Sequence, residues 1–122
     1  MKALQLNVGV RQQLPFPAFV VRLDVIGEIG IDAEGRLIVK PGSERFPYIY
    51  REAMEVHWDA VGEFLFSPKP RQWSYFEWFR QILEAARTQG CDLRVSEGTR
   101  WNNIPSELAA QMRAHSGDAW QS

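Results

Sequence analysis

The sequence predicts a single α+β domain, in which one antiparallel sheet of about five to seven strands packs against one main helix and a short C-terminal helix. Three observations support this fold class. Apolar and polar residues alternate along much of the first half of the chain, a helical apolar stripe begins near Ser74, and a length of 122 residues suits one domain. We expect residues 1–114 to form the domain and residues 115–122 to form a flexible tail.

Two strands are predicted at the start of the chain. Leu4–Val10 alternates apolar with polar residues, and a second strand over Ala18–Ile26 follows an interruption that contains two prolines. We expect Arg22 and Asp24 on the polar face of the second strand. Its buried face is expected to hold Phe19, Val21, Leu23 and Val25.

Two hairpins are predicted in the middle of the chain. Glu28–Lys40 turns at Asp32–Gly35, where the glycine supplies a positive φ, and Glu55–Phe66 turns at Asp59–Gly62. The inward residues of the second hairpin are expected to be Val56, Trp58, Phe64 and Phe66. Between the hairpins, an alternation typical of a strand involves Phe46, Tyr48 and Tyr50. Arg51–Glu55 fits either a helical turn or an irregular crossing.

The clearest helix is predicted to run from Ser74 to Gln89. Ser74 is a good N-cap, and Glu77 completes a capping box with it. Trp73 and Trp78 occupy the two positions of a hydrophobic staple. The buried stripe of the helix is expected to consist of Tyr75, Phe79, Ile82 and Ala86, and the glycine at position 90 can end the helix in a left-handed conformation.

The remaining chain is predicted to form a strand and a short helix. Cys91–Val95 is the strand, and a helix over Pro105–Ala114 buries Ile104, Leu108 and Met112. Arg100–Asn103 leads into this helix, either with an asparagine as its cap or as the rim of a ligand site.

Composition and charge exclude several classes of function. The chain has 14 Lys and Arg residues against 15 Asp and Glu residues, a balance that gives no overall attraction to nucleic acid or to an anionic membrane. The N-terminal residues lack the apolar run of a signal peptide, and no stretch approaches the roughly twenty apolar residues of a membrane span. The single cysteine, Cys91, cannot form an internal disulfide. We therefore expect a cytoplasmic protein that binds neither nucleic acid nor membrane.

Basic residues surround the start of the predicted main helix. Lys69, Arg71 and Arg80 lie where the positive end of the helix dipole disfavours cations, so an acidic group is expected nearby. It can be an internal carboxylate such as Asp59 or Glu63, the acidic surface of a protein partner, or a small anion at the helix N-terminus. The capping box weakens the last alternative, because it already uses some of the free backbone donors.

One stretch carries a resemblance to a known group of proteins. Trp58 and Asp59, followed by F-S-P-K-P-R-x-W-S-Y-x-x-W-F over Phe66–Phe79, are similar to a stretch in small proteins of mobile integron gene cassettes. The resemblance covers about a fifth of the chain. It implies a bacterial accessory protein of unassigned activity with a small α+β fold that often self-associates, and it supplies no functional residues.

The aromatic content predicts a binding or interaction protein. Tyr48, Tyr50, Trp58, Trp101 and Trp120 exceed what one helix can cover, and exposed aromatic surface marks a partner or a ligand. We expect an aromatic face or cleft with a basic rim, a homodimer, and either an acidic protein partner or a small anionic ligand. The candidate binding residues are Tyr48, Tyr50, Arg51, His57, Trp58, Lys69, Arg71 and Trp101.

An enzyme is the alternative interpretation. His57 could act as an acid or base oriented by Asp59 or Glu55 in a small hydrolase or isomerase, but no nucleophile stands in a recognisable setting. These three side chains cannot easily converge on one metal ion along a straight strand. Cys91 opens an apolar strand, the usual setting of an unreactive thiol. The sequence therefore predicts no catalytic residue, metal site or cofactor.

Overall fold

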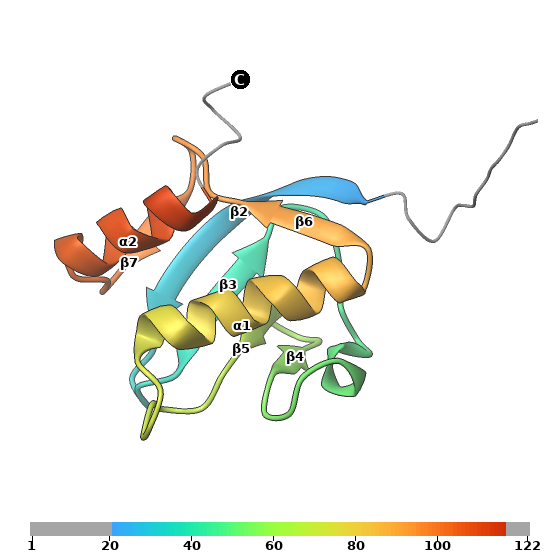
Figure 1. Ribbon diagram of the computed structural model, residues 1–122, viewed down its shortest axis with the longest axis horizontal. Coiled ribbons are helices and arrows are strands. Elements are labelled where there is room, and N and C mark those ends of the chain that lie inside the picture. Colours follow the sequence, from blue (N-terminus) through green and yellow to red (C-terminus); the bar gives the residue numbers. More distant parts are fainter. Residues whose placement is uncertain (1–20, 117–122) are drawn as a thin grey trace, which may run out of the picture.

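The structure is a computed structural model that describes residues 21–116. Within these residues, one six-stranded sheet is covered by a long helix, with a second helix beside it (Figure 1). In chain order the elements are β2 Arg22–Ile31, β3 Leu37–Pro41, η2 Ile49–Arg51, β4 His57–Asp59, β5 Phe64–Phe66, α1 Tyr75–Thr88, β6 Cys91–Arg94, β7 Arg100–Asn102 and α2 Ser106–Ser116. The predicted strand Leu4–Val10, the expected inward Phe19, and Trp120 lie outside the described residues.

The sheet is organised around β2. Its strand order is β4-β5-β3-β2-β6, and β7 also pairs with β2. The pairs β2–β3, β3–β5 and β4–β5 are antiparallel, whereas β6 and β7 run parallel to β2. The α+β fold class is confirmed, with the difference that the sheet is mixed. The parallel pair β2–β6 arises because the chain reaches β6 through α1, which crosses the sheet.

The core fills the space between α1 and the sheet. Helix α1 packs on β3 and β6, and α2 packs on α1. The largest fully buried side chains are Phe46, Phe79, Ile26, Ile29, Leu37, Ile49, Leu65, Ile82, Leu93, Met112, Val39 and Val56. Among residues 21–116, neither helix is long and apolar enough to cross a membrane.

The predicted faces of β2 are wrong. Leu23 is 62% exposed and Val21 and Val25 are also exposed, while Asp24 and Ile26 are buried. The Asp24 carboxylate accepts hydrogen bonds from the backbone N–H groups of Ser43 and Glu44, the latter at 2.9 Å. A carboxylate can be buried only when hydrogen-bond donors satisfy its oxygens, and this turn supplies those donors to Asp24. Leu23 and Val25 form the outer face of the first half of β2, and the exposed Val21 directly precedes the strand.

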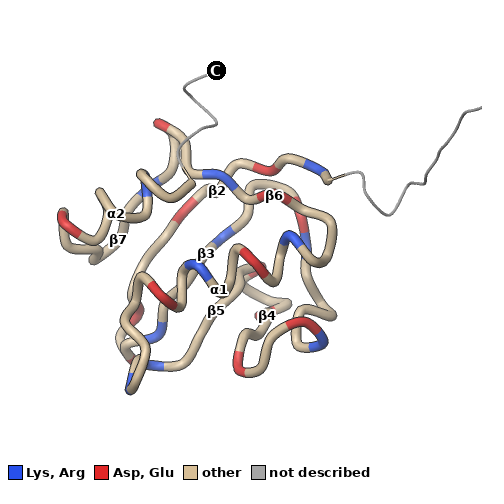
Figure 2. Tube along the Cα trace, in the orientation of Figure 1, with Lys and Arg blue, Asp and Glu red and all other residues tan. Residues whose placement is uncertain are grey.

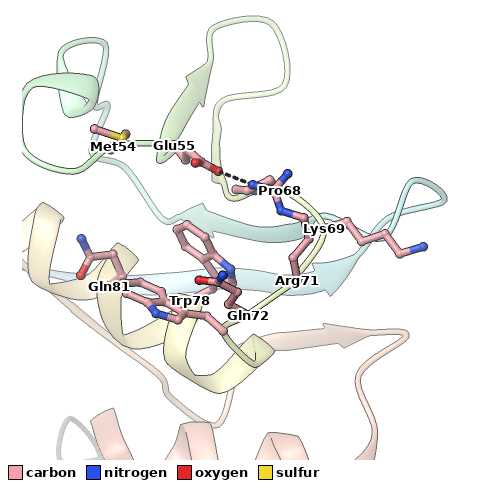
Figure 3. Close-up of a pocket in the computed structure, with 9 residues that line it drawn as sticks. Met54, Glu55, Pro68, Lys69, Arg71, Gln72, Trp78 and Gln81 are labelled. Atoms are coloured by element: carbon pink, nitrogen blue, oxygen red, sulfur yellow. Dashed lines mark ion pairs between the residues drawn. The ribbon is translucent and has the colours of Figure 1, made fainter.

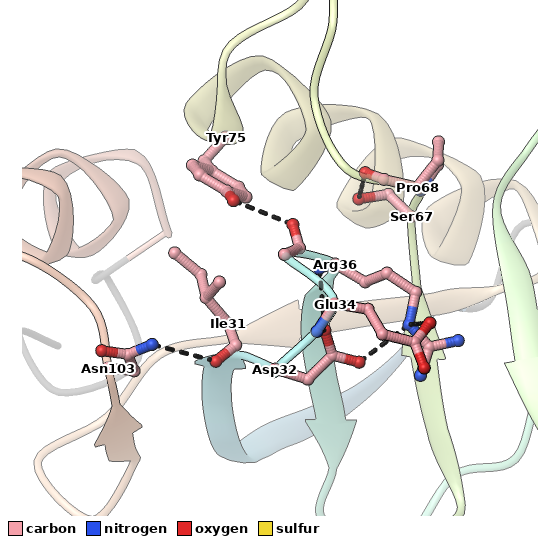
Figure 4. A network of polar contacts seen from close by, with 9 residues as sticks. Ile31, Asp32, Glu34, Arg36, Ser67, Pro68, Tyr75 and Asn103 are labelled. Atoms are coloured by element: carbon pink, nitrogen blue, oxygen red, sulfur yellow. Dashed lines mark hydrogen bonds and ion pairs between the residues drawn. The ribbon is translucent and has the colours of Figure 1, made fainter.

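The first predicted hairpin is confirmed. The Asp32 carboxylate accepts hydrogen bonds from the backbone N–H groups of Glu34 and Arg36 and from Arg36 Nε at 2.7 Å (Figure 4). Burial alone would raise the pKa of Asp32, but the hydrogen bonds from Arg36 outweigh it and lower the pKa. Gly35 has the expected positive φ of 83°, and its carbonyl accepts a 2.8 Å hydrogen bond from the Tyr75 hydroxyl. That bond ties the first turn of α1 to the hairpin.

The strand predicted around Phe46, Tyr48 and Tyr50 is wrong. This segment forms turns and the short helix η2, and it buries Phe46 and Ile49, which are three residues apart. The buried residues of this segment are therefore spaced as in a helix rather than at every second position as in a strand, and Tyr48 and Tyr50 stay exposed. The crossing that follows is irregular, and Glu55 takes a left-handed φ of 67°.

The second predicted hairpin is confirmed, but one of its faces is inverted. Strands β4 and β5 pair with Trp58 opposite Leu65, and Leu65 is the fully buried residue of β5. Phe64 and Phe66, predicted to face inward, lie on the other side of the strand and are only partly buried. The reason is the register: Leu65 also pairs with Val39 of β3, whose side chain points into the core.

Helix α1 follows its local signals. Both bonds of the capping box between Ser74 and Glu77 are present, and the helix buries Phe79, Ile82, Ala85 and Ala86. Gly90 follows with a φ of 87°.

Strand β6 and helix α2 also form as predicted, although α2 runs to Ser116, so residues 115–116 are helical rather than part of a tail. Strand β7, also three residues long, was not expected, because no hairpin turn marks it as the turn at Asp59–Gly62 marks β4 and β5.

Candidate functional site

A cleft with a volume of about 490 Å³ lies beside the start of α1. Figure 3 shows the side chains that line it. The turn after η2, the lead-in segment to α1 and the first half of α1 together form its walls. The lining residues are Met54, Glu55, Pro68, Lys69, Arg71, Gln72, Trp73, Trp78 and Gln81.

Two tryptophans form one side of the cleft. The capping box fixes where α1 begins, so Trp73 directly precedes the N-cap and Trp78 lies one turn into the helix. Their ring centroids are 4.9 Å apart with an interplanar angle of 53°. Trp78 is partly buried and packs against the core, whereas Trp73 is 42% exposed. The predicted staple is thus confirmed, and it also places two indole rings at the surface of a cleft.

The opposite wall is formed by Met54 and Glu55. Met54 is 84% exposed. Glu55 has a φ of 67°, a left-handed conformation that costs free energy in a residue other than glycine. Its Oε1 lies 3.8 Å from Arg71 Nη2 across the mouth of the cleft.

The carboxylates pair with basic residues differently from the prediction. Glu55 is the acidic neighbour of Arg71, in place of the Asp59 or Glu63 expected from the sequence. Glu63 instead pairs with Arg45 at 2.7 Å, and the Asp59 carboxylate accepts the backbone N–H of Val61. Figure 2 shows basic and acidic positions interspersed along the described chain.

Lys69 lines the cleft, but its ammonium group points away from it (Figure 3). The aliphatic part of its side chain packs over Gly35, where an added Cβ would lie 3.1 Å from Lys69 Cγ and Cδ. Of the two basic residues that line the cleft, Arg71 is therefore the one that offers its charge to a bound molecule.

The predicted residues Tyr48, Tyr50 and Arg51 form a separate exposed group on η2. The two tyrosine rings are 6.4 Å apart, and the Arg51 guanidinium lies 4.8 Å from the Tyr48 ring centroid. None of the three lines the cleft. The basic rim predicted from Arg51, Lys69 and Arg71 is therefore not assembled at one place.

Trp58 and Trp101 are partly buried rather than part of an exposed aromatic face. Both pack against the hydrophobic core. Trp58 also makes an edge contact with Phe46, with ring centroids 5.9 Å apart, and the Arg113 guanidinium lies 5.0 Å from the ring centroid of Trp101. The expected exposure of these two rings is therefore wrong, whereas Tyr48 and Tyr50 are exposed as expected.

The residues of the enzyme interpretation are not brought together. His57 is exposed and its ring lies 5.3 Å from that of Phe66. Within the described chain, His57 forms no hydrogen bond with Glu55 or Asp59, and no cluster of three or more His, Cys, Asp or Glu residues could hold a metal ion. Cys91 is buried, and burial raises the pKa of its thiol to about 12.

Of the residues that line the cleft, the sequence predicted only Lys69 and Arg71 as binding residues. It missed Met54, Glu55, Pro68, Gln72, Trp73, Trp78 and Gln81. It assigned both tryptophans to the hydrophobic staple of the helix. A signal was present, however: two tryptophans stand at the start of one helix, and tryptophan is enriched at interfaces. The contribution of Met54 depends on a turn that the local sequence did not predict.

Comparisons with known proteins agree on one family. The model of the family described as Integron Cassette Protein Hfx_Cass5 matches residues 24–99, a range that includes every residue lining the cleft. A solved structure of an Integron Cassette Protein Hfx_Cass5, from the mobile metagenome of the North West Arm sewage outfall, is 48% identical to the chain. That match covers 75% of this chain and 92% of the other, with a TM-score of 0.38. No curated protein matches significantly.

Proposed function

The chain belongs to the Hfx_Cass5 family of integron cassette proteins, and we propose that it is a binding protein whose cleft beside α1 holds a small, largely apolar ligand. The observation that carries this proposal is the pair of indole rings in a concave site of about 490 Å³. Sites for small molecules typically occupy some 300–1,000 Å³ and combine aromatic walls with a few polar groups. Gln72 and Gln81 supply such groups here.

The exposure of the cleft side chains favours a ligand over mere packing. Met54 is 84% exposed and Trp73 is 42% exposed, although both are large and apolar. Covering apolar surface is favourable by about 25 cal/mol per Å². A flat molecule seated against Trp73 and Met54 would remove such surface from water without rearranging the core.

A neutral fluorescent probe, N-phenyl-1-naphthylamine, tests the proposal. We expect its fluorescence to rise saturably with the wild-type protein, and the Trp73→Ala substitution to weaken binding about tenfold, since stacking on an aromatic ring contributes on the order of 1–3 kcal/mol. Tyr50→Ala is the matched control, because Tyr50 is exposed but lies outside the cleft. Equal binding to wild type and Trp73→Ala would refute the cleft as the site.

We also propose that the protein self-associates through the outer face of β2. Leu23, at 62% exposure, and Val25 lie next to Asp92 and Arg94 of β6 in the parallel register. In two copies packed face to face about a two-fold axis across the strands, Leu23 of one copy meets Val25 of the other. Asp92 and Arg94 already pair with each other within one chain at 2.8 Å, so the apolar residues carry the proposal.

Molar mass in solution, measured by light scattering over a dilution series, tests this second proposal. The wild-type protein should be a dimer that dissociates on dilution, and Leu23→Ser should be a monomer throughout. Val61→Ser is the control, because Val61 is 95% exposed on the β4–β5 turn. A wild-type monomer at every concentration, or a dimer that survives Leu23→Ser, would contradict it.

A further inference from the structure

We infer that the cleft selects planar aromatic anions, whose carboxylate or sulfonate group replaces Glu55 as the partner of Arg71. This inference rests on the proposed function and names the chemical class of its ligand. Three features support it: the long ion pair of Arg71, the direction of the Arg71 side chain, and the capping box at the start of α1.

The guanidinium of Arg71 retains its hydrogen-bonding capacity. Its Nη2 lies 3.8 Å from Glu55 Oε1, beyond the range of about 2.7–3.2 Å for an N–H···O hydrogen bond. Arg45, in contrast, donates to Glu63 from both Nε and Nη2, at 3.1 and 2.7 Å. Within residues 21–116, Arg71 donates no hydrogen bond. A planar guanidinium with free donors suits the two oxygens of a carboxylate or sulfonate.

The position of Arg71 places those donors at the edge of an aromatic site. Arg71 rises from the lead-in segment, and its side chain reaches toward Glu55 at the mouth of the cleft (Figure 3). Arg71 and Trp73 line the same cleft, so one bound molecule can contact both. Because the Lys69 ammonium points away, Arg71 supplies the positive charge of the lining.

The N-terminus of α1 is a weaker site for the anion than Arg71. Glu77 Oε1 accepts the backbone N–H of Ser74 at 2.8 Å, and Ser74 Oγ accepts that of Glu77 at 3.2 Å. These bonds use donors that an anion would need, and Glu77 adds a negative charge there. The anionic group is therefore expected at Arg71.

Glu55 opposes the binding of an anion. Its left-handed backbone, with φ at 67°, holds the carboxylate at the cleft mouth opposite Arg71. The ion pair between the two exposed side chains is long and weak, so an incoming anion with better geometry can displace it. Removing the charge of Glu55 should consequently strengthen the binding of anions and leave neutral ligands unaffected.

Two probes that differ by one charged group test the inference. 8-Anilino-1-naphthalenesulfonate is N-phenyl-1-naphthylamine with an added sulfonate, so comparing their affinities isolates the anion. We expect Arg71→Gln to weaken binding of the sulfonate about tenfold and that of the neutral probe less than about twofold. Glu55→Gln should strengthen binding of the sulfonate about threefold without changing that of the neutral probe.

Arg45→Gln is the matched control, because it changes the net charge equally and removes an arginine whose side chain, 65% exposed, lies outside the cleft. The inference is overturned if Arg71→Gln affects both probes equally, or if Arg45→Gln weakens sulfonate binding as much as Arg71→Gln does. If Trp73→Ala changes the affinity of neither probe, the proposed function itself fails. The Arg71 side chain is 79% exposed, so its replacement should leave unfolding by urea unchanged.

Discussion

The start of α1 and the first half of β2 both present large apolar side chains to solvent, but the two surfaces have different shapes. Around α1, Trp73 and Met54 line a concave site with Arg71 at its edge. On β2, Leu23 and Val25 project from one side of an extended strand. A concave aromatic site suits a small molecule, whereas an exposed strand face suits another protein surface. The cleft therefore suits ligand binding, and the outer face of β2 suits self-association.

The buried sides of the same two elements also differ. Helix α1 buries apolar side chains such as Phe79, as its amphipathic pattern indicates. Strand β2 buries the carboxylate of Asp24, which holds the turn at Ser43 and Glu44. The helix is thus stabilised mainly by apolar packing, and the start of the strand partly by hydrogen bonds.

The largest effect on stability is expected from the buried side of α1. Phe79→Ala should lower the free energy of unfolding by about 3–5 kcal/mol, because it leaves a cavity in a fully buried position. Urea unfolding followed by circular dichroism measures this. Trp73→Ala should cost only about 0.5–1.5 kcal/mol, the contribution of one aromatic pair. Similar losses for the two variants would mean that Trp73 belongs to the core rather than to a binding site.

The buried carboxylate of β2 is expected to give the second largest effect. Asp24→Ala should lower the free energy of unfolding by about 1–3 kcal/mol, since the N–H groups of Ser43 and Glu44 lose their acceptor. Hydrogen exchange at these two amides should speed up in the variant. Unchanged stability and exchange would show that Asp24 faces solvent, as the alternation of the sequence suggests.

Removal of the helix cap should have a smaller effect. Ser74→Ala should cost about 1 kcal/mol of stability, because the Glu77 N–H loses its acceptor. The capping box also positions Trp73, so the variant should bind N-phenyl-1-naphthylamine less tightly than wild type. Ser43→Ala, a serine in the turn held by Asp24, is a control in which probe binding should stay unchanged.

The smallest effect on stability is expected on the outer face of β2. Leu23→Ser should change the free energy of unfolding by no more than about 0.5 kcal/mol when parent and variant are both monomeric, because the side chain is already 62% exposed. Urea unfolding at low protein concentration measures this. A loss of several kcal/mol would instead show that another part of the same chain covers Leu23.

The sequence predicted α1 well because its signals are local. The cap at Ser74, the staple of Trp73 and Trp78, and the glycine at position 90 all act within a few residues of the helix ends. The two hairpins were predictable for the same reason.

Local signals could not show which faces of β2 and β5 are buried, because these faces depend on distant parts of the chain. Asp24 is buried because of a turn nineteen residues later in the chain, and the register between β2 and β3 shifts between Ile26 and Glu28. An alternating pattern does not reveal such a shift. The inward position of Leu65 likewise depends on its pairing with Val39 of another hairpin.

The candidate site was predictable only in part. Arg71 and Lys69 were identified from their place before the helix, but the direction of Lys69 depends on its packing over Gly35 of another hairpin. Glu55 and Met54 reach the cleft through an irregular turn with a left-handed residue, for which the sequence offers no glycine or asparagine as a signal.

The most direct test of the account is a ¹H–¹⁵N NMR titration of the wild-type protein with 8-anilino-1-naphthalenesulfonate. The indole N–H signals of Trp73 and Trp78 and the amides of Met54, Glu55 and Arg71 should shift together and saturate, while those of Leu23 and Val25 stay in place. Shifts confined to the outer face of β2, with both indole signals unchanged, would contradict the assignment of ligand binding to the cleft.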